Sequence, residues 1–220
     1  NEVVQGMVGY TDSEQNVWIA NSEGLFTSDL RVYTRFSVSA IASNGTENQS
    51  GFFGPGGMQG FEIFDRHIDP EFVARKAAKM AVTMLHAPLC PAGQMPVVID
   101  NGFGGVIFHE ACGHGLEASS VAYGQSVFAG KLGQQIANPK VTAIDDGTIA
   151  NAWGSINIDD EGNPSQRNVL IENGVLKSYM VDRLGSRRMG VPMTGNSRSH
   201  ELIAGELCRD NSIDTLYYED

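Results

Sequence analysis

The chain has 220 residues, of which 41% are hydrophobic and 19% are charged, a composition typical of a globular protein that is long enough to bury a substantial core. Its formal net charge of -11 argues against a nucleic-acid partner, because binding to phosphates requires a basic face. No apolar run reaches the roughly 18 residues of a membrane span, and the first residues lack the basic leader and apolar segment of an export signal, so neither a membrane protein nor an exported one is expected.

The cysteine content indicates a reducing environment. Cys90, Cys112 and Cys208 are too few, and odd in number, for a disulfide framework. We therefore expect a cytoplasmic location. The chain also begins in what reads as the middle of a strand, so we expect it to be a fragment of a larger chain.

The first part of the chain, residues 2–64, is predicted to be rich in β-strand. Residues 17–29 and 32–43 alternate apolar and polar side chains, as half-buried strands do. The glycine-rich segment 44–60 is expected to be a mobile loop. It contains neither of the two glycine patterns of phosphate-binding loops, GxxxxGK(S/T) and GxGxxG.

Residues 69–86 form the clearest predicted helix. Asp69 is placed to cap it, and Pro70 takes the first helical position, where its missing N–H costs nothing. Five apolar residues recur at helical spacing and are predicted to face the core: Val73, Ala77, Met80, Ala81 and Met84.

The rest of the chain is predicted to alternate between short strands and turns. Residues 95–100 are expected to form a short buried strand that leads into the region of the motif, residues 95–118. Residues 140–182 are predicted to contain strands that end in acidic turns, among them 154–162, and a hairpin that turns at Asn173 and Gly174. Because no convincing linker is visible, the sequence predicts one α+β domain with a mixed, mainly antiparallel sheet.

The segment 109–114, HEACGH, carries residue types that suit a metal site. Catalytic zinc takes roughly three protein ligands and keeps one position for water, whose proton a nearby glutamate can accept. In a regular helix, residues five apart are separated by about 140°, too far for His109 and His114 to share one ion. A π-bulge eased by Gly113 would return them to one face, so a shared ion requires a distorted helix around residues 111–113. From the spacing alone, a buried helix with two hydrogen-bonded histidines is an equal alternative.

Cys112 is a further candidate within the motif. It cannot readily face the same ion as both His109 and His114, and a small cysteine between glycine and alanine is typical of packing. A Cys112–His114 thiol–imidazole pair is the main enzymatic alternative.

Two groups of charged residues are weaker candidates. The acidic turn of Asp159, Asp160 and Glu161 is expected to be solvated, with a site for a cation or a substrate amine as the alternative. Three arginines are candidates for holding a peptide carboxylate, although arginines are common on surfaces: Arg167, Arg187 and Arg188.

Several blocks of the sequence together resemble the TldD family, whose members and TldE/PmbA partners are known as modulators of DNA gyrase and as metalloproteases. These blocks are GVIFHEACGHGLEASS (105–120), FAGKLGQQIANPKVTAIDDGT (128–148), the segment 154–191 and TGNSR (194–198). The most specific are the HExxxH motif and the run DDEG-x-P-x-QR-x-VLIENG. The resemblance extends from about residue 5 to residue 198.

The resemblance implies a zinc-dependent hydrolase. His109 and His114 match the family's histidine ligands, and Glu110 matches the general base that activates water on the metal. It also implies that the protein cleaves unfolded peptides within an oligomer formed with a second copy, as in a homodimer, or with a TldE/PmbA-type subunit. Because that subunit lacks the motif, this chain resembles the catalytic TldD-type subunit. The alternative from another class is a non-catalytic scaffold or regulatory subunit.

The sequence departs from the family pattern in two places. Family members are much longer and carry an N-terminal α/β domain that is absent here. Their third metal ligand is a cysteine near the C-terminus, whereas the tail 199–220 matches nothing in the family and Cys208 does not correspond to that ligand. Without a third ligand we expect a lower metal affinity.

Overall fold

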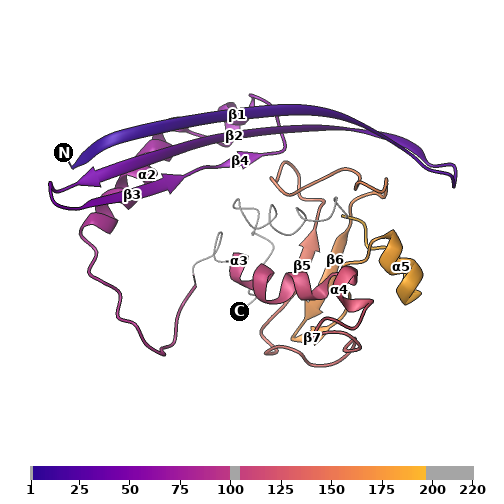
Figure 1. The fold of residues 1–220 in the computed structure, drawn as a ribbon. Coiled ribbons are helices and arrows are strands. Elements are labelled where there is room, and N and C mark those ends of the chain that lie inside the picture. Colours follow the sequence, from indigo (N-terminus) through magenta and orange to yellow (C-terminus); the bar gives the residue numbers. More distant parts are fainter. Residues whose placement is uncertain (1, 100–104, 197–220) are drawn as a thin grey trace. The chain divides into compact units, whose positions relative to one another are not determined.

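The computed structural model describes residues 2–99 and 105–196, and the chain divides into two compact units (Figure 1). The first unit contains residues 2–14 and 32–99, and the second contains residues 15–31 and 105–196. Both units combine antiparallel strands with helices, which confirms the predicted α+β class. Since the sequence shows no clear linker, it predicts a single domain that makes up the catalytic portion. The structure has two separate groups of buried apolar side chains, one in each unit.

One sheet, whose two long strands carry residues of both units, has the strand order β1-β2-β3, and β4 also pairs with β2. These strands are β1 (Val3–Ala20), β2 (Phe26–Ser43), β3 (Asn48–Phe53) and β4 (Gly56–Gly57). β2 and β3 are antiparallel, with paired residues from Val38↔Phe53 to Ser43↔Asn48. The expectation of a mobile loop over residues 44–60 is therefore wrong where β3 and β4 lie. Pairing with β2 gives this glycine-rich backbone hydrogen-bond partners that its own sequence does not reveal.

Helix α2 (Pro70–Leu85), which follows the single-turn α1 (Ile63–Arg66), begins where the sequence predicts. The Asp69 side chain accepts a hydrogen bond from the Glu71 N–H and so caps the helix. Its buried face consists of Val73, Ala77, Ala81 and Leu85.

The prediction that Met80 and Met84 also face the core is wrong, since they are 42% and 46% exposed. The buried face of α2 is narrow, because its buried residues occur only at every fourth position, from Val73 to Leu85. Its two alanines, Ala77 and Ala81, lie against Gly51 of β3, where a Cβ atom would overlap the Ala77 carbonyl oxygen.

Residues 95–99 do not form the predicted buried strand. They have no regular secondary structure, and Val98 is fully exposed while Ile99 is 51% exposed. A short apolar run has the composition of a buried strand, but it becomes one only where a sheet edge is available to pair with it. The last residue of the predicted strand, at position 100, lies outside the described residues.

The sheet of the second unit has the order β5-β6-β7. Its strands are β5 (Ala143–Asp146), β6 (Arg167–Glu172) and β7 (Val175–Leu176). The predicted turn at Asn173 and Gly174 is confirmed, with positive φ angles of 49° and 77° at the two residues, as a tight hairpin turn requires. Residues 154–162, predicted as a strand, instead form turns and one isolated bridge, Ile158↔Pro164.

The helices of the second unit are short. They are α3 (Gly105–Phe108), a π-helical turn (His109–Gly113), a 3₁₀ turn (His114–Leu116), α4 (Ala118–Val121) and α5 (Arg183–Met189). Leu116 and Ala118 pack with Leu170 and Ile171 of β6 in the core of this unit. The core therefore holds the segment that follows the HEACGH motif.

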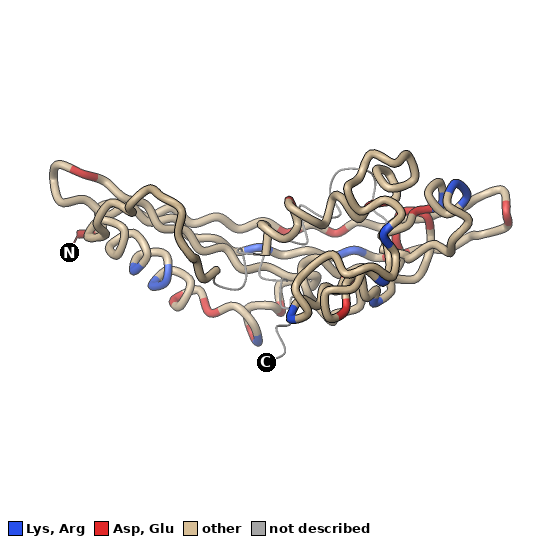
Figure 2. The backbone as a smooth tube through the Cα atoms, turned by 90° about the horizontal axis from the view of Figure 1, so that it is seen from below, with Lys and Arg blue, Asp and Glu red and all other residues tan. Residues whose placement is uncertain are grey.

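Ion pairs attach residues 15–31 to the rest of the second unit. Arg31 donates to the Asp160 carboxylate at 2.8 Å and to the Ile158 carbonyl at 3.1 Å. Glu23 pairs with Arg183 and, at 3.0 Å, with Arg187. Basic and acidic residues are interspersed along the backbone rather than separated by sign (Figure 2).

Candidate metal centre

The HEACGH motif lies on a helix that changes its winding within the motif. The turn His109–Gly113 is π-helical, and the N–H of His114 donates to the carbonyl of His109, five residues earlier. A π-helical turn brings residues five apart onto one face, which a regular helix does not. The predicted distortion around residues 111–113 is therefore confirmed.

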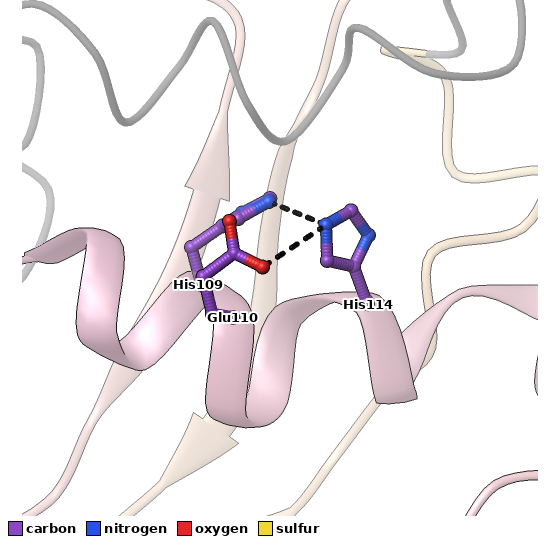
Figure 3. A group of neighbouring side chains, drawn as sticks. All are labelled: His109, Glu110 and His114. Atoms are coloured by element: carbon purple, nitrogen blue, oxygen red, sulfur yellow. Dashed lines mark hydrogen bonds and ion pairs between the residues drawn. The ribbon is translucent and has the colours of Figure 1, made fainter.

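The two histidine rings converge above this turn (Figure 3). Their Nε2 atoms are 3.0 Å apart, and the ring planes are inclined at 70° with centroids 4.3 Å apart. One carboxylate oxygen of Glu110 is 3.8 Å from the Nε2 of His114. Ligand atoms of all three residues lie within 4.8 Å of one another, and they form the one group of this kind found among the described residues.

The three side chains differ in their exposure to solvent. His109 is buried, with 5% of its surface exposed, whereas the side chains of Glu110 and His114 are 64% and 48% exposed. Burial lowers the pKa of His109 and the neighbouring His114 lowers it further, against an opposing effect of Glu110. A lowered pKa keeps the imidazole neutral, and only a neutral imidazole has a lone pair for a metal.

The donor atoms fit a zinc ion. Zinc–imidazole bonds are about 2.0–2.1 Å long and zinc sites are tetrahedral, so two nitrogens that share one ion lie about 3.3–3.4 Å apart. The Nε2 atoms of His109 and His114 are 3.0 Å apart, within hydrogen-bond distance of each other, so they need to separate by only a few tenths of an ångström to share one ion. Imidazole nitrogens also suit zinc by chemical type. These two residues could thus hold a metal, with the exposed carboxylate of Glu110 beside them.

Gly113 provides space beside the His109 ring. Its φ and ψ of -55° and -57° are ordinary for a right-handed helix, so the backbone itself does not require glycine. A Cβ atom at this position would lie 3.2 Å from the Nδ1 of His109, closer than an unstrained contact. The sequence pointed to Gly113 for backbone freedom, whereas the structure shows that it leaves room for a ring.

We expect Gly113→Ala to weaken zinc binding by up to about tenfold, because His109 must shift to accommodate the methyl group. Alanine favours helices over glycine, so the melting temperature of the metal-free protein should not fall. Competition with a chromophoric chelator measures the affinity. Gly93→Ala is the control, since its Cβ would meet only the end of Met95, at 3.7 Å. An unchanged affinity in Gly113→Ala would contradict this role.

Glu117 also belongs to the centre, although it lies outside the HEACGH motif. Its Oε1 atom is 3.0 Å from the Nδ1 of His114. The available signal was the spacing, because a carboxylate three residues after a histidine on a helical segment lies next to it.

The structure gives Cys112 little support as a ligand or a nucleophile. It lies outside the group of converging ligand atoms found in the described part of the chain. The thiol is half-buried, and burial raises its pKa, whereas a reactive thiol needs a lowered pKa. Cys208 and the tail 199–220, which bear on the third ligand, lie outside the described residues.

The acidic turn after Ile158 organises the fold. The expectation of a solvated turn is wrong for Asp159, which is fully buried and accepts hydrogen bonds from the N–H groups of Glu161 and Asn163. Asp160 pairs with Arg31. The Glu161 carboxylate accepts a hydrogen bond from the N–H of Arg183. All three carboxylates thus take part in hydrogen bonds that hold the chain around them.

The three candidate arginines are spread over separate contacts. Arg167 lies 3.7 Å from the Asp146 carboxylate, Arg187 pairs with Glu23, and Arg188 lies over the ring of Tyr123. No described contact joins any of them to His109 or His114.

Among the described residues, no helix has the length and apolar character to cross a membrane.

Family comparisons cover nearly all of the chain. Residues 92–207 match the PmbA/TldA metallopeptidase C-terminal domain, and residues 1–85 match the central domain of the same family. The Metalloprotease TldD homolog of Haemophilus influenzae is 43% identical over 188 residues, which cover 84% of this chain and 39% of that protein. A metalloprotease of Methanothermobacter thermautotrophicus is 39% identical over 197 residues, covering 90% of this chain and 43% of that protein. The chain thus spans about two fifths of these relatives.

Solved structures agree with the sequence comparisons. A candidate modulator of DNA gyrase from Thermotoga maritima matches with a TM-score of 0.77 and 27% identity, over 90% of this chain and 45% of that one. TldE from Thermococcus kodakarensis matches with a TM-score of 0.66 and 20% identity, over 90% of this chain and 43% of that one. At that identity, the second match shows the shared fold alone.

Proposed function

The chain belongs to the PmbA/TldD metallopeptidase family, and we propose that it contributes the zinc site of an enzyme that hydrolyses peptide bonds in unfolded peptides. The observation that carries this proposal is the convergence of two imidazole nitrogens 3.0 Å apart, with a carboxylate oxygen 3.8 Å from one of them. Curated relatives named metalloproteases support the reaction class.

We assign a separate role to each residue of the motif. His109 and His114 would hold the zinc ion through their Nε2 atoms. In such a site zinc acidifies a water molecule and polarises the carbonyl oxygen of the substrate. Glu110 acts as the general base: its exposed carboxylate accepts the proton of the attacking water and can pass it to the leaving amine. Burial lowers the pKa of His109 and so favours the neutral ring that a metal requires.

The substrate, partner and location are further parts of the proposal. The motif residues are all present, which supports a TldD-type catalytic subunit. The fold that the chain shares with TldE supports an assembly with a second copy or with a related subunit of that type. A site enclosed by such an assembly would admit unfolded peptides and exclude folded proteins. The low, odd number of cysteines supports a cytoplasmic location.

The test is the metal content of the full-length protein and of its histidine variants. We expect about one zinc ion per chain in the parent protein. His109→Ala and His114→Ala should each lose the metal and the peptide cleavage, because each removes one ligand. His67→Ala, which replaces an exposed histidine of the first unit, is the matched control and should retain both. A parent protein without metal, or a His109→Ala variant that binds zinc as tightly as the parent, would refute the proposal.

A thiol mechanism at Cys112 makes the opposite predictions. Cleavage would then survive chelators and be lost in Cys112→Ala. The raised pKa of the Cys112 thiol argues against this mechanism, because it disfavours the thiolate.

A further inference from the structure

The carboxylate of Glu117 lies between two side-chain groups that hold it. Its Oε1 atom is 3.0 Å from the Nδ1 of His114, and its Oε2 atom accepts a hydrogen bond from the Ser119 hydroxyl at 3.2 Å. Glu117 is the residue before helix α4, a position from which side chains often cap a helix, yet it makes no such cap. Its side chain is instead engaged by His114 and Ser119.

The backbone of Glu117 is anchored in the core of the second unit. Its neighbours Leu116 and Ala118 are 0% and 2% exposed. The Leu116 carbonyl accepts from the N–H of Met180 at 2.9 Å, and the N–H of Ala118 donates to the Met180 carbonyl at 2.8 Å. Glu117 thus extends from a buried, hydrogen-bonded part of the backbone towards His114, whose side chain is 48% exposed.

The contact determines which nitrogen of His114 is available to a metal. An ionised carboxylate can only accept hydrogen bonds, so the Nδ1 of His114 must carry the hydrogen that points at Glu117. The lone pair of the neutral ring then lies on Nε2, the atom that is 3.0 Å from the Nε2 of His109. Histidines that bind metals commonly donate their other N–H to a carboxylate in this way.

We propose that Glu117 is a positioning residue that holds His114 with its Nε2 lone pair turned towards His109, and that Ser119 in turn holds Glu117. This inference rests on the proposed metal function of His109 and His114. It assigns to Glu117 an effect on metal affinity through His114, without contact with the ion.

The test is the zinc affinity of full-length variants, measured by competition between Zn²⁺ and a chromophoric chelator. Glu117→Ala should weaken zinc binding about 10- to 100-fold, the usual effect of losing such a partner. Glu117→Gln should lose less, because its amide oxygen still accepts from Nδ1–H. Glu172→Ala, which removes an exposed carboxylate of the same unit, is the control and should bind as the parent does.

The melting temperature of the metal-free variants separates positioning from general damage. It should stay close to that of the parent while the affinity falls. If Glu117→Ala does not fold, the zinc affinity of Ser119→Ala is the deciding measurement. An affinity about two- to tenfold weaker than that of the parent supports the contacts from Ser119 through Glu117 to His114, and an unchanged affinity overturns the proposal. Equal losses in Glu117→Ala and Glu117→Gln, or none in either, also overturn the proposal.

The outcomes distinguish this inference from the function on which it rests. If the parent binds zinc and the two histidine variants do not, while Glu117→Ala binds like the parent, only the role of Glu117 fails. If the parent binds no zinc, both fail.

Discussion

Replacing Glu110 by glutamine is expected to slow peptide cleavage by the full-length protein about 10²- to 10⁴-fold, the usual contribution of a general base, while leaving its zinc content unchanged. Glutamine has nearly the size and shape of glutamate but cannot accept a proton at neutral pH. The Glu110 side chain is 64% exposed, so the substitution should not disturb the packing of the unit.

This variant also separates two roles that the geometry permits. The carboxylate of Glu110 lies within 4.8 Å of the ligand atoms of both histidines, a distance that suits either a metal ligand or a base beside the metal. If Glu110 is the base, zinc stays and turnover is lost. If it is a ligand, zinc content falls with turnover.

The measurements are zinc content by elemental analysis and the cleavage rate of an unstructured peptide that carries a fluorophore and a quencher. Glu172→Gln, an exposed glutamate on β6, is the control and should change neither quantity. A Glu110→Gln variant that cleaves as fast as the parent would exclude Glu110 as the base.

The largest effect on stability is expected at Gly51, where β3 meets helix α2. A Cβ atom at this position would overlap the carbonyl oxygen of Ala77, and it would lie 2.5 Å from the nitrogen of Ala81 and 2.9 Å from the Cβ of Met80. Two of these three atoms belong to the helix backbone, which cannot rotate away as a long side chain can. Gly51→Ala must therefore push α2 away from the sheet and open the core beneath Ala77 and Ala81.

We expect Gly51→Ala to lower the free energy of unfolding by about 1–3 kcal/mol or more, as overpacked cores do. Thermal unfolding measures this as a fall in melting temperature of several degrees. Gly6→Ala is the matched control, since β1 leaves nothing within 4 Å of the new Cβ atom. That substitution should be neutral or slightly stabilising. Equal melting temperatures for the two variants would show that α2 does not pack on β3 as described.

The parts of the fold that were predicted correctly depend on short-range chemistry. The start of α2 follows from Asp69 and Pro70, and the hairpin turn follows from Asn173 and Gly174. The π-helical turn was predicted by a different argument, from the chemical requirement that His109 and His114 reach one ion. Each of these predictions used residues within a few positions of one another.

The wrong predictions concern elements that depend on distant partners. Residues 95–99 have the composition of a buried strand but no strand beside them, whereas the glycine-rich segment contains β3 because β2 pairs with it. Asp159 was expected in solvent because it stands in a polar turn. It is buried because the backbone amides of that turn close around its carboxylate.

By itself, the sequence determined the class of the fold, the resemblance to the family and the three motif residues, because residue type and local spacing encode them. Only the tertiary structure decided the distances, the burial and the mutual contacts of the residues of the metal centre. It placed the two Nε2 atoms 3.0 Å apart, buried His109 and left Glu110 in solvent. It also placed the Glu117 carboxylate beside His114. It showed that the missing side chain of Gly113 leaves room for the His109 ring. The physical reason is that side-chain direction, burial and close approach follow from the packing of the whole unit.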